Sequence, residues 1–296
     1  MIFEKLKRKL VLKKITGHLG KIVETEDKII CYVKKRKCRS NRFELIISCK
    51  GIGHPTKDLA KKYNIDKKIC YVIENIKTRS KRVYIFGHDD AEIIIKNSTF
   101  SDITTHINGK CTIDNVIFET YLNLMLGAKE LTLKNIKLDN YFDNIARLGI
   151  CIGADNELEI IDSEIGKQKQ RIKISLLSPK IILKDSIISA DEVKIETKKL
   201  ESNSNSKIIS IIVDYKVEDF DKINIESAII KYNNEELNTK GEKIVLKKLN
   251  KPLELQRVKL LTTLKSIGKK CETQNEHEIE EYSKKLNKKK INEIIK

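Results

Sequence analysis

Tryptophan is absent from this chain of 296 residues, and aromatic residues make up only 5% of it. The core must therefore be built from Ile, Leu and Val, which suits a narrow, layered interior. Because few aromatic rings are available to stack on sugar rings, the composition also argues against a protein that acts on polysaccharides.

Long apolar runs and the common cofactor motifs are missing as well. No stretch approaches the ~20 consecutive apolar residues of a membrane-spanning helix, and the basic N-terminus lacks the apolar segment of a signal peptide. Neither G-x-x-x-x-G-K-[ST] nor G-x-G-x-x-G occurs, and the five histidines lack the spacing of metal ligands. We therefore expect a cytoplasmic protein, either free or peripheral to the membrane, that holds no cofactor and no metal.

The seven cysteines are odd in number and include no C-x-x-C pair. Such a set is typical of free thiols in a reducing compartment. A second hypothesis concerns Cys31 and Cys38, which lie beside a run of Lys and Arg. Nearby cations lower the pKa of a thiol, so these two cysteines are candidates for a reactive role.

An eight-residue phrase recurs between Ala91 and Leu200. It reads apolar, any, apolar, any, then Asn, Asp or Thr, two loose positions and a final apolar residue. Apolar residues two apart lie on one face of a strand, and Asn and Asp favour bends. The copies begin at Ile93, Cys111, Leu131, Leu158, Ile181 and Val193, and a further copy with Ser at the polar position begins at Ile223. Short apolar strands with small-residue turns, such as residues 123–129 and 149–155, precede most copies.

Successive bend residues are 18, 20, 27 and 23 positions apart from Asn97 to Asp185, which indicates a coil of about twenty residues. One unit cannot bury its own apolar face, but stacked copies can. Over roughly residues 43–245 the pattern resembles the right-handed parallel β-helix of the pectate-lyase-like group. The resemblance is in the repeat pattern alone, and no catalytic motif of that group is present. The fold class that we predict is thus an all-β solenoid, a single-stranded right-handed parallel β-helix. An antiparallel sandwich is the alternative, since Asn108-Gly109 suits a tight hairpin.

Three parts follow along the chain. Residues 1–20 form a basic amphipathic helix, residues 21–250 the parallel β-helix and residues 251–296 a C-terminal helical segment. Phe3, Leu6 and Leu10, with Val11 beside them, are the predicted apolar face of the first helix. That face either caps the open end of the solenoid, which we favour, or lies on an anionic membrane surface. The C-terminal helices are expected to cover the other end or to bind a partner.

Positive charge is concentrated near the N-terminus. Residues 1–40 hold 13 Lys and Arg against 4 Asp and Glu, a net +9 of the total +17. Such clusters bind phosphate groups or membrane surfaces. The sequence therefore predicts a non-catalytic scaffold that binds a protein partner or an anionic surface, either a membrane, a nucleic acid or an acidic polymer. The predicted contact residues are Lys34, Lys35, Arg36, Lys37 and Arg39, assisted by Lys7, Arg8 and Lys9.

The alternative function is a polysaccharide lyase or glycoside hydrolase. It predicts a groove on one lateral face where at least two carboxylates and a Lys or Arg converge, since such groups perform acid and base steps. The weak catalytic candidates are Asp89, Asp90, Asp143 and Arg147. Most acids of the repeats sit at turns, where Asp is chosen for backbone reasons.

Overall fold

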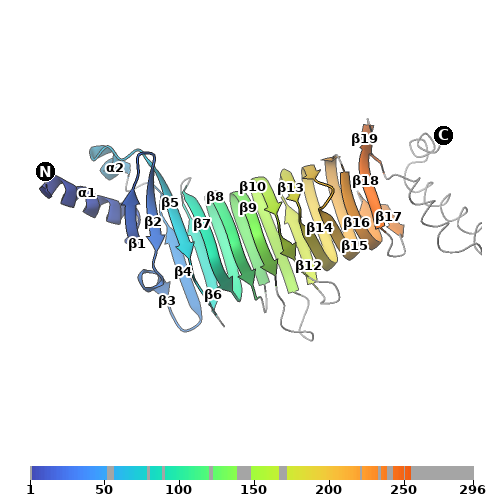
Figure 1. Ribbon diagram of the computed structural model, residues 1–296, viewed down its shortest axis with the longest axis horizontal. Helices are drawn as coiled ribbons and strands as arrows, with labels where there is room; N and C mark the ends of the chain where they lie inside the picture. The colour runs from blue at the N-terminus through green and yellow to red at the C-terminus, as the bar shows by residue number, and fades with distance from the viewer. Residues whose placement is uncertain are drawn as a thin grey trace, which may run out of the picture.

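The polar residue of the repeated phrase marks a sharp bend, as the sequence predicts. The backbone angle φ is 50° at Asn97, 53° at Asn115, 52° at Asn135, 46° at Asp162 and 49° at Asp185. Asn and Asp adopt this left-handed conformation more readily than other non-glycine residues. Repeated once per coil, the bend winds the chain into a β-solenoid of about seven turns in this computed structural model (Figure 1).

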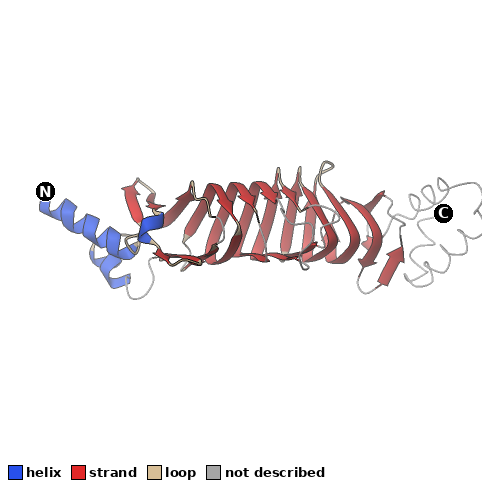
Figure 2. Ribbon diagram, turned by 90° about the horizontal axis from the view of Figure 1, so that it is seen from below, coloured by secondary structure: helices blue, strands red, loops and turns tan. Residues whose placement is uncertain are grey.

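The structure describes residues 2–51, 57–78, 81–88, 91–119, 123–138, 148–166, 172–220, 222–232, 235–238, 243–249 and 251–254. Within them the helices are α1 (Ile2–Ile15), α2 (Lys57–Lys62) and the 3-10 helix η1 (Lys35–Lys37). All three lie at the N-terminal end of the solenoid, whose coils are otherwise strands and corners (Figure 2).

Parallel ladders form three faces of the coil. Face one contains β4 (Glu44–Cys49), β6 (Arg82–Gly87) and β12 (Ile172–Leu177), and face two contains β2 (Lys28–Val33), β5 (Lys68–Glu74) and β13 (Lys180–Lys184). Face three follows the bend and includes β11 (Glu164–Ile165). The remaining coil strands turn corners and so join two or three faces: β7 (Glu92–Phe100), β8 (Asp102–Phe118), β9 (Asn123–Leu138), β10 (Leu148–Ile161), β14 (Ile187–Ser202), β15 (Lys207–Phe220) and β16 (Lys222–Tyr232).

The register excludes the antiparallel sandwich for the repeated phrase. Residues Ile93, Cys111, Leu131 and Leu158 are neighbours in one parallel ladder. Two residues further along, Ile113, Leu133 and Ile160 stack in consecutive layers, and each is fully buried. Like aliphatic side chains thus pack on one another along the axis, which allows the core to do without tryptophan.

The predicted copies of the phrase that begin at Val193 and Ile223 do not occupy the same faces of the coil as the other copies, so their assignment is wrong. Val193 pairs with Ile174 on face one, and Ile225 pairs with Ile208 on face three. Thr197 stands at a corner, where its hydroxyl donates to the carbonyl of Pro179 across 3.1 Å. Apolar residues alternate in the same way on every face, so alternation by itself does not reveal which face a strand joins.

The position after the bend points inward, and hydroxyls stack there in the later coils. The buried Ser163 accepts at its Oγ from the backbone N–H of Ile136 at 3.0 Å. The backbone N–H of Ser163 donates in turn to Oγ of Ser186 at 3.2 Å, and that of Ser186 to Oγ of Ser206 at 3.2 Å. This serine ladder pairs backbone groups at the corner that strand pairing leaves free.

Antiparallel pairs flank the parallel coils at both ends. At the N-terminal end β1 (Gly20–Glu24) pairs with β2, and β3 (Arg39–Ser40) pairs with β4. At the other end the pairing passes from β16 to three short strands, β17 (Glu235–Asn238), β18 (Lys243–Leu249) and β19 (Lys251–Glu254). Strand β19 begins the segment predicted to be helical, and the rest of that segment, residues 255–296, lies outside the described residues.

Candidate functional site

The predicted basic cluster forms a compact turn at the N-terminal end of the solenoid. Strand β2 ends at Val33, and η1 follows, closed by the N–H of Lys37 donating to the carbonyl of Lys34 at 2.8 Å. The Cys38 thiol donates to the same carbonyl at 3.6 Å. Because the turn is tight and lies outside the core, its side chains project into solvent. We call the five exposed cations the basic loop: Lys34, Lys35, Arg36, Lys37 and Arg39.

The basic loop differs from the coils in how its charges are compensated. On the coils, several lysines pair with glutamates of other rungs, as in Lys28–Glu92 at 2.8 Å and Lys184–Glu159 at 2.7 Å. Within the described residues, no cation of the basic loop has an acidic partner within ion-pair distance. The loop therefore concentrates uncompensated positive charge at one end of the molecule.

A shallow hollow of about 640 Å³ lies beside the basic loop. Lys34, Lys35 and Arg36 line it together with the corner residues 74–77. Lys77 adds a fourth cation that the sequence did not single out, and the carboxylate of Glu74 is occupied by Lys96 at 3.3 Å. The hollow is therefore suited to phosphate or carboxylate groups of a bound surface.

The three assisting residues on α1 have different roles. The Arg8 guanidinium binds both carboxylate oxygens of Glu24, at 2.6 and 3.1 Å, and donates to the carbonyl of Tyr63 at 2.9 Å. Because these bonds occupy its guanidinium, Arg8 anchors the helix and is not available to bind a ligand. Lys7 lies over the Phe3 ring at 4.5 Å and 3.5 Å from Glu4, whereas Lys9 is exposed.

The apolar face predicted for α1 is wrong in part. Val11, Leu12 and Ile15 are buried in the core at the N-terminal end, but Phe3, Leu6 and Leu10 are exposed. The buried set and the exposed set lie on opposite sides of the helix, since successive residues are rotated by about 100°. The sequence pattern merged them because both sets are apolar.

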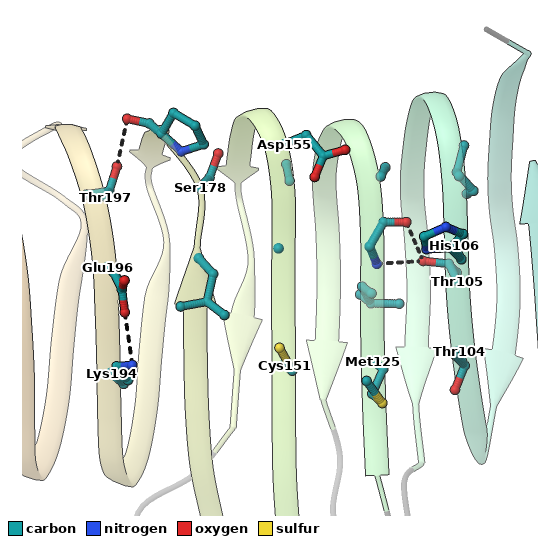
Figure 3. Close-up of a pocket in the computed structure, with 18 of the residues that line it drawn as sticks. Thr104, Thr105, His106, Met125, Cys151, Asp155, Ser178, Lys194, Glu196 and Thr197 are labelled. Carbon is teal, nitrogen blue, oxygen red and sulfur yellow. Dashed lines mark hydrogen bonds and ion pairs between the residues drawn. The ribbon is translucent and has the colours of Figure 1, made fainter. Parts of the chain in front are cut away.

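Face one carries a second hollow, an open groove of about 1230 Å³ (Figure 3). A row of outward-facing residues crosses the strands of the groove, from Thr104 through Met125 and Cys151 toward Lys194. The sequence placed Gly127 and Gly153 in turns, but they lie within β9 and β10 and form the floor of the groove. A Cβ at Gly127 would come within 3.3 Å of the Thr105 carbonyl oxygen, and one at Gly153 within 3.2 Å of that of Leu177.

The groove does not bring two free carboxylates together. Asp155 lies at its edge on β10, and Glu196 lies on β14, with β12 between the two strands (Figure 3). Lys194 binds Glu196 at 2.9 Å, and this hydrogen bond lowers the pKa of Glu196, so the carboxyl is unsuited to donate a proton near neutral pH. The catalytic candidates Asp89, Asp90, Asp143 and Arg147 lie outside the described residues.

The lowered pKa that the sequence suggested for the thiols of Cys31 and Cys38 is not found. Burial raises the pKa of each thiol to about 11, because the thiolate would lose its hydration in these surroundings. The lysines of the basic loop point away into solvent, which weakens their effect on Cys38. All six described cysteines are free, and burial raises the pKa of Cys111 to about 12.

The described residues contain no group of three or more His, Cys, Asp or Glu side chains arranged to hold a metal ion. Neither described α-helix has the length and apolar character needed to cross a bilayer. Comparison of the chain with protein-family models, with curated proteins and with solved structures finds no match.

Proposed function

We propose that this protein is a non-catalytic β-helix scaffold that binds an anionic surface through the basic loop. The observation that carries the proposal is the contrast between the uncompensated cations of the basic loop and the paired lysines of the coils. Cations without a protein partner keep their attraction for phosphate and carboxylate groups. The surface is that of a membrane, a nucleic acid, an acidic polymer or an acidic protein partner.

The proposal places the protein in the cytoplasm, peripheral to a membrane if the anionic surface is lipid. Six free cysteines among the described residues support a reducing compartment. We also infer a right-handed coil of the pectate-lyase-like kind, because crossovers between parallel strands of one sheet are right-handed in about 98% of cases. An experimentally phased crystal structure would test the handedness.

The test of binding compares two variants of equal net charge. The loop variant carries Lys34→Glu, Lys35→Glu and Arg36→Glu. The control variant carries Lys110→Glu, Lys134→Glu and Lys137→Glu, three exposed lysines on the coils. Binding of each protein to anionic vesicles, to duplex and single-stranded nucleic acid and to an acidic polysaccharide is titrated at low and high salt.

We expect the loop variant to lose about 100-fold or more in affinity for one of these surfaces, since each cation near an anionic surface contributes roughly 1 kcal/mol. The control variant should bind as the parent does, and the parent's affinity should fall steeply as salt rises. Equal losses in both variants would mean that net charge alone drives the binding, and salt-insensitive binding by all three proteins would refute the proposal.

A second candidate function, a polysaccharide lyase or glycoside hydrolase, is favoured by one observation, the open groove on face one. Its test is turnover of acidic glycans by the parent chain and by Lys194→Ala, which removes the cation that pairs with Glu196. The scaffold proposal expects no turnover by either protein. Turnover that Lys194→Ala abolishes would replace the scaffold proposal with the enzymatic one.

A further inference from the structure

Helix α1 is divided into an anchored face and a free face. Glu4, Arg8, Val11 and Ile15 follow helical spacing along the anchored face, where Arg8 binds Glu24 and Ile15 is fully buried. Most of the helix projects beyond the last coil at the N-terminal end (Figures 1 and 2). The side of α1 turned away from the anchored face is therefore open along its length.

An apolar stripe runs along the free face. The exposed fractions are 83% for Ile2, 67% for Phe3, 58% for Leu6 and 56% for Leu10. Ile2, Leu6 and Leu10 are spaced by four residues and Phe3 lies beside them, so the four side chains form one row. Four large apolar side chains grouped on one exposed face mark an interaction surface, whereas single exposed ones do not.

Lysines border the stripe on both sides. Lys5, Lys9 and Lys13 follow one edge at spacings of four, and Lys7 and Lys14 follow the other edge. The single acid of the helix, Glu4, lies on the anchored side by helical spacing, and its exposed carboxylate is 3.5 Å from Lys7. An apolar row with cations along both edges, and an acid beside only one of them, matches the boundary between acyl chains and anionic headgroups.

We propose that α1 lies in the plane of an anionic lipid bilayer, with Ile2, Phe3, Leu6 and Leu10 inserted among the acyl chains. The bordering lysines then lie at the level of the lipid phosphates. The inference rests on the proposed function, because it identifies the anionic surface as a bilayer and the basic loop supplies further attraction at the same end of the solenoid. Nucleic acid would satisfy the lysines but leave the apolar stripe in water.

The absence of tryptophan from the chain makes insertion directly measurable. Phe3→Trp places one indole on the stripe, and Met125→Trp places one at an exposed site on face one, 50% exposed in the parent. Both full-length proteins are mixed with vesicles of phosphatidylcholine alone or with phosphatidylserine. We expect the emission of the residue-3 indole to shift to the blue, and brominated acyl chains to quench it, only with phosphatidylserine present. The indole at position 125 should respond to neither.

A second pair of variants separates this inference from the proposed function. Leu6→Ser with Leu10→Ser removes the centre of the stripe, while Met125→Ser with Ile211→Ser removes exposed apolar side chains from the coils. The stripe variant should bind anionic vesicles about 100-fold more weakly, the coil variant as tightly as the parent. Both should keep the thermal stability of the parent, since the changed side chains are exposed.

Three results would overturn the insertion of α1. If the stripe variant binds vesicles as the parent does while the loop variant does not, the basic loop acts alone and the proposed function survives. If no protein binds vesicles but the parent binds nucleic acid through the loop, the bilayer is the wrong surface. If the stripe variant abolishes a concentration-dependent self-association of the parent, the stripe is an interface between two copies of this chain.

Discussion

The Nδ2 group of Asn115 donates a hydrogen bond of 2.8 Å to Oδ1 of Asn97, one coil earlier at the same bend. The ladder continues in altered form, since Asn135 donates to Asp114 at 2.9 Å and Asn205 donates to Asp185 at 2.7 Å. Asn97, Asn115, Asn135 and Asp185 thus each have two functions. Each adopts a positive φ, and its side chain ties one corner of the solenoid to a neighbouring coil.

These two functions give different predictions for Asn115→Ala and Asn115→Gly. Alanine loses the hydrogen bond and must also adopt the left-handed conformation, so we expect a loss of about 1–2 kcal/mol in the free energy of unfolding. Glycine loses the same bond but adopts a positive φ without a steric cost, so it should be the milder change. Urea denaturation midpoints measure both. A larger loss for glycine than for alanine would show that the φ value is unimportant.

The serine ladder predicts that Ser186→Ala lowers the free energy of unfolding by more than the loss of one small hydroxyl group would suggest. The Ser186 hydroxyl accepts from the N–H of Ser163 and donates to the carbonyl of Lys184 at 2.7 Å. Alanine would leave the Ser163 N–H buried without a partner, which costs about 1–3 kcal/mol. The control is Ser175→Ala on face one, where the side chain is half-buried. If the two variants unfold at the same urea concentration, the ladder does not contribute to stability.

The sequence predicted local structure well at positions where the backbone conformation can be adopted by only a few residue types. Asn97, Asn115, Asn135, Asp162 and Asp185 could be predicted as bends because few residues adopt a positive φ, and the stacking of Ile113, Leu133 and Ile160 followed from those bends. The basic loop could also be predicted from the sequence. A run of Lys and Arg that directly follows a strand falls in a loop, and loops lie on the surface.

What the sequence left undetermined depends on contacts between coils or at the ends. Alternation alone could not assign Val193 to face one, nor distinguish the anchored face of α1 from the stripe around Leu6. The glycines at 127 and 153 were read as turns because glycine favours turns, yet here they lie in strands where an outward side chain would fill the groove. Only the register of neighbouring rungs brings them together.

The thiols give a prediction for chemical labelling. With the pKa of Cys38 at about 11, the reactive thiolate at pH 8 is scarcer by roughly 200-fold than in an unfolded chain, where a thiol has a pKa near 8.5. In a Cys271→Ser variant, which removes the cysteine outside the described residues, an aromatic disulfide reagent should therefore react slowly with the native protein and rapidly in urea. A fast-reacting thiol in the native protein that is lost in Cys38→Ser or Cys31→Ser would restore the reactive-cysteine hypothesis, whereas one lost in Cys151→Ser would belong to the groove on face one.

The anchor of α1 predicts a dependence of stability on pH. The hydrogen bond from Arg8 lowers the pKa of Glu24, and Lys67, 3.3 Å from the same carboxylate, lowers it further, against the opposing effect of burial. Because the pKa is lower in the folded protein, the ionised carboxylate stabilises the fold above the ordinary glutamate pKa of about 4.3. This contribution is lost as the pH falls through the lowered pKa.

Glu24→Gln should therefore lower the free energy of unfolding by about 1 kcal/mol at pH 7, a value typical of a well-formed ion pair near the surface. The difference between this variant and the parent should stay constant down to about pH 5 and shrink as the parent's carboxyl is protonated at lower pH. Glu26→Gln, an exposed change two residues away, is the matched control and should leave stability nearly unchanged at every pH. Amide exchange in α1 should also become faster in Glu24→Gln at pH 7, because Arg8 loses the partner that holds the helix against the first strand. If Glu24→Gln is as stable as the parent at pH 7 and leaves the exchange unchanged, Val11, Leu12 and Ile15 anchor α1 without the ion pair.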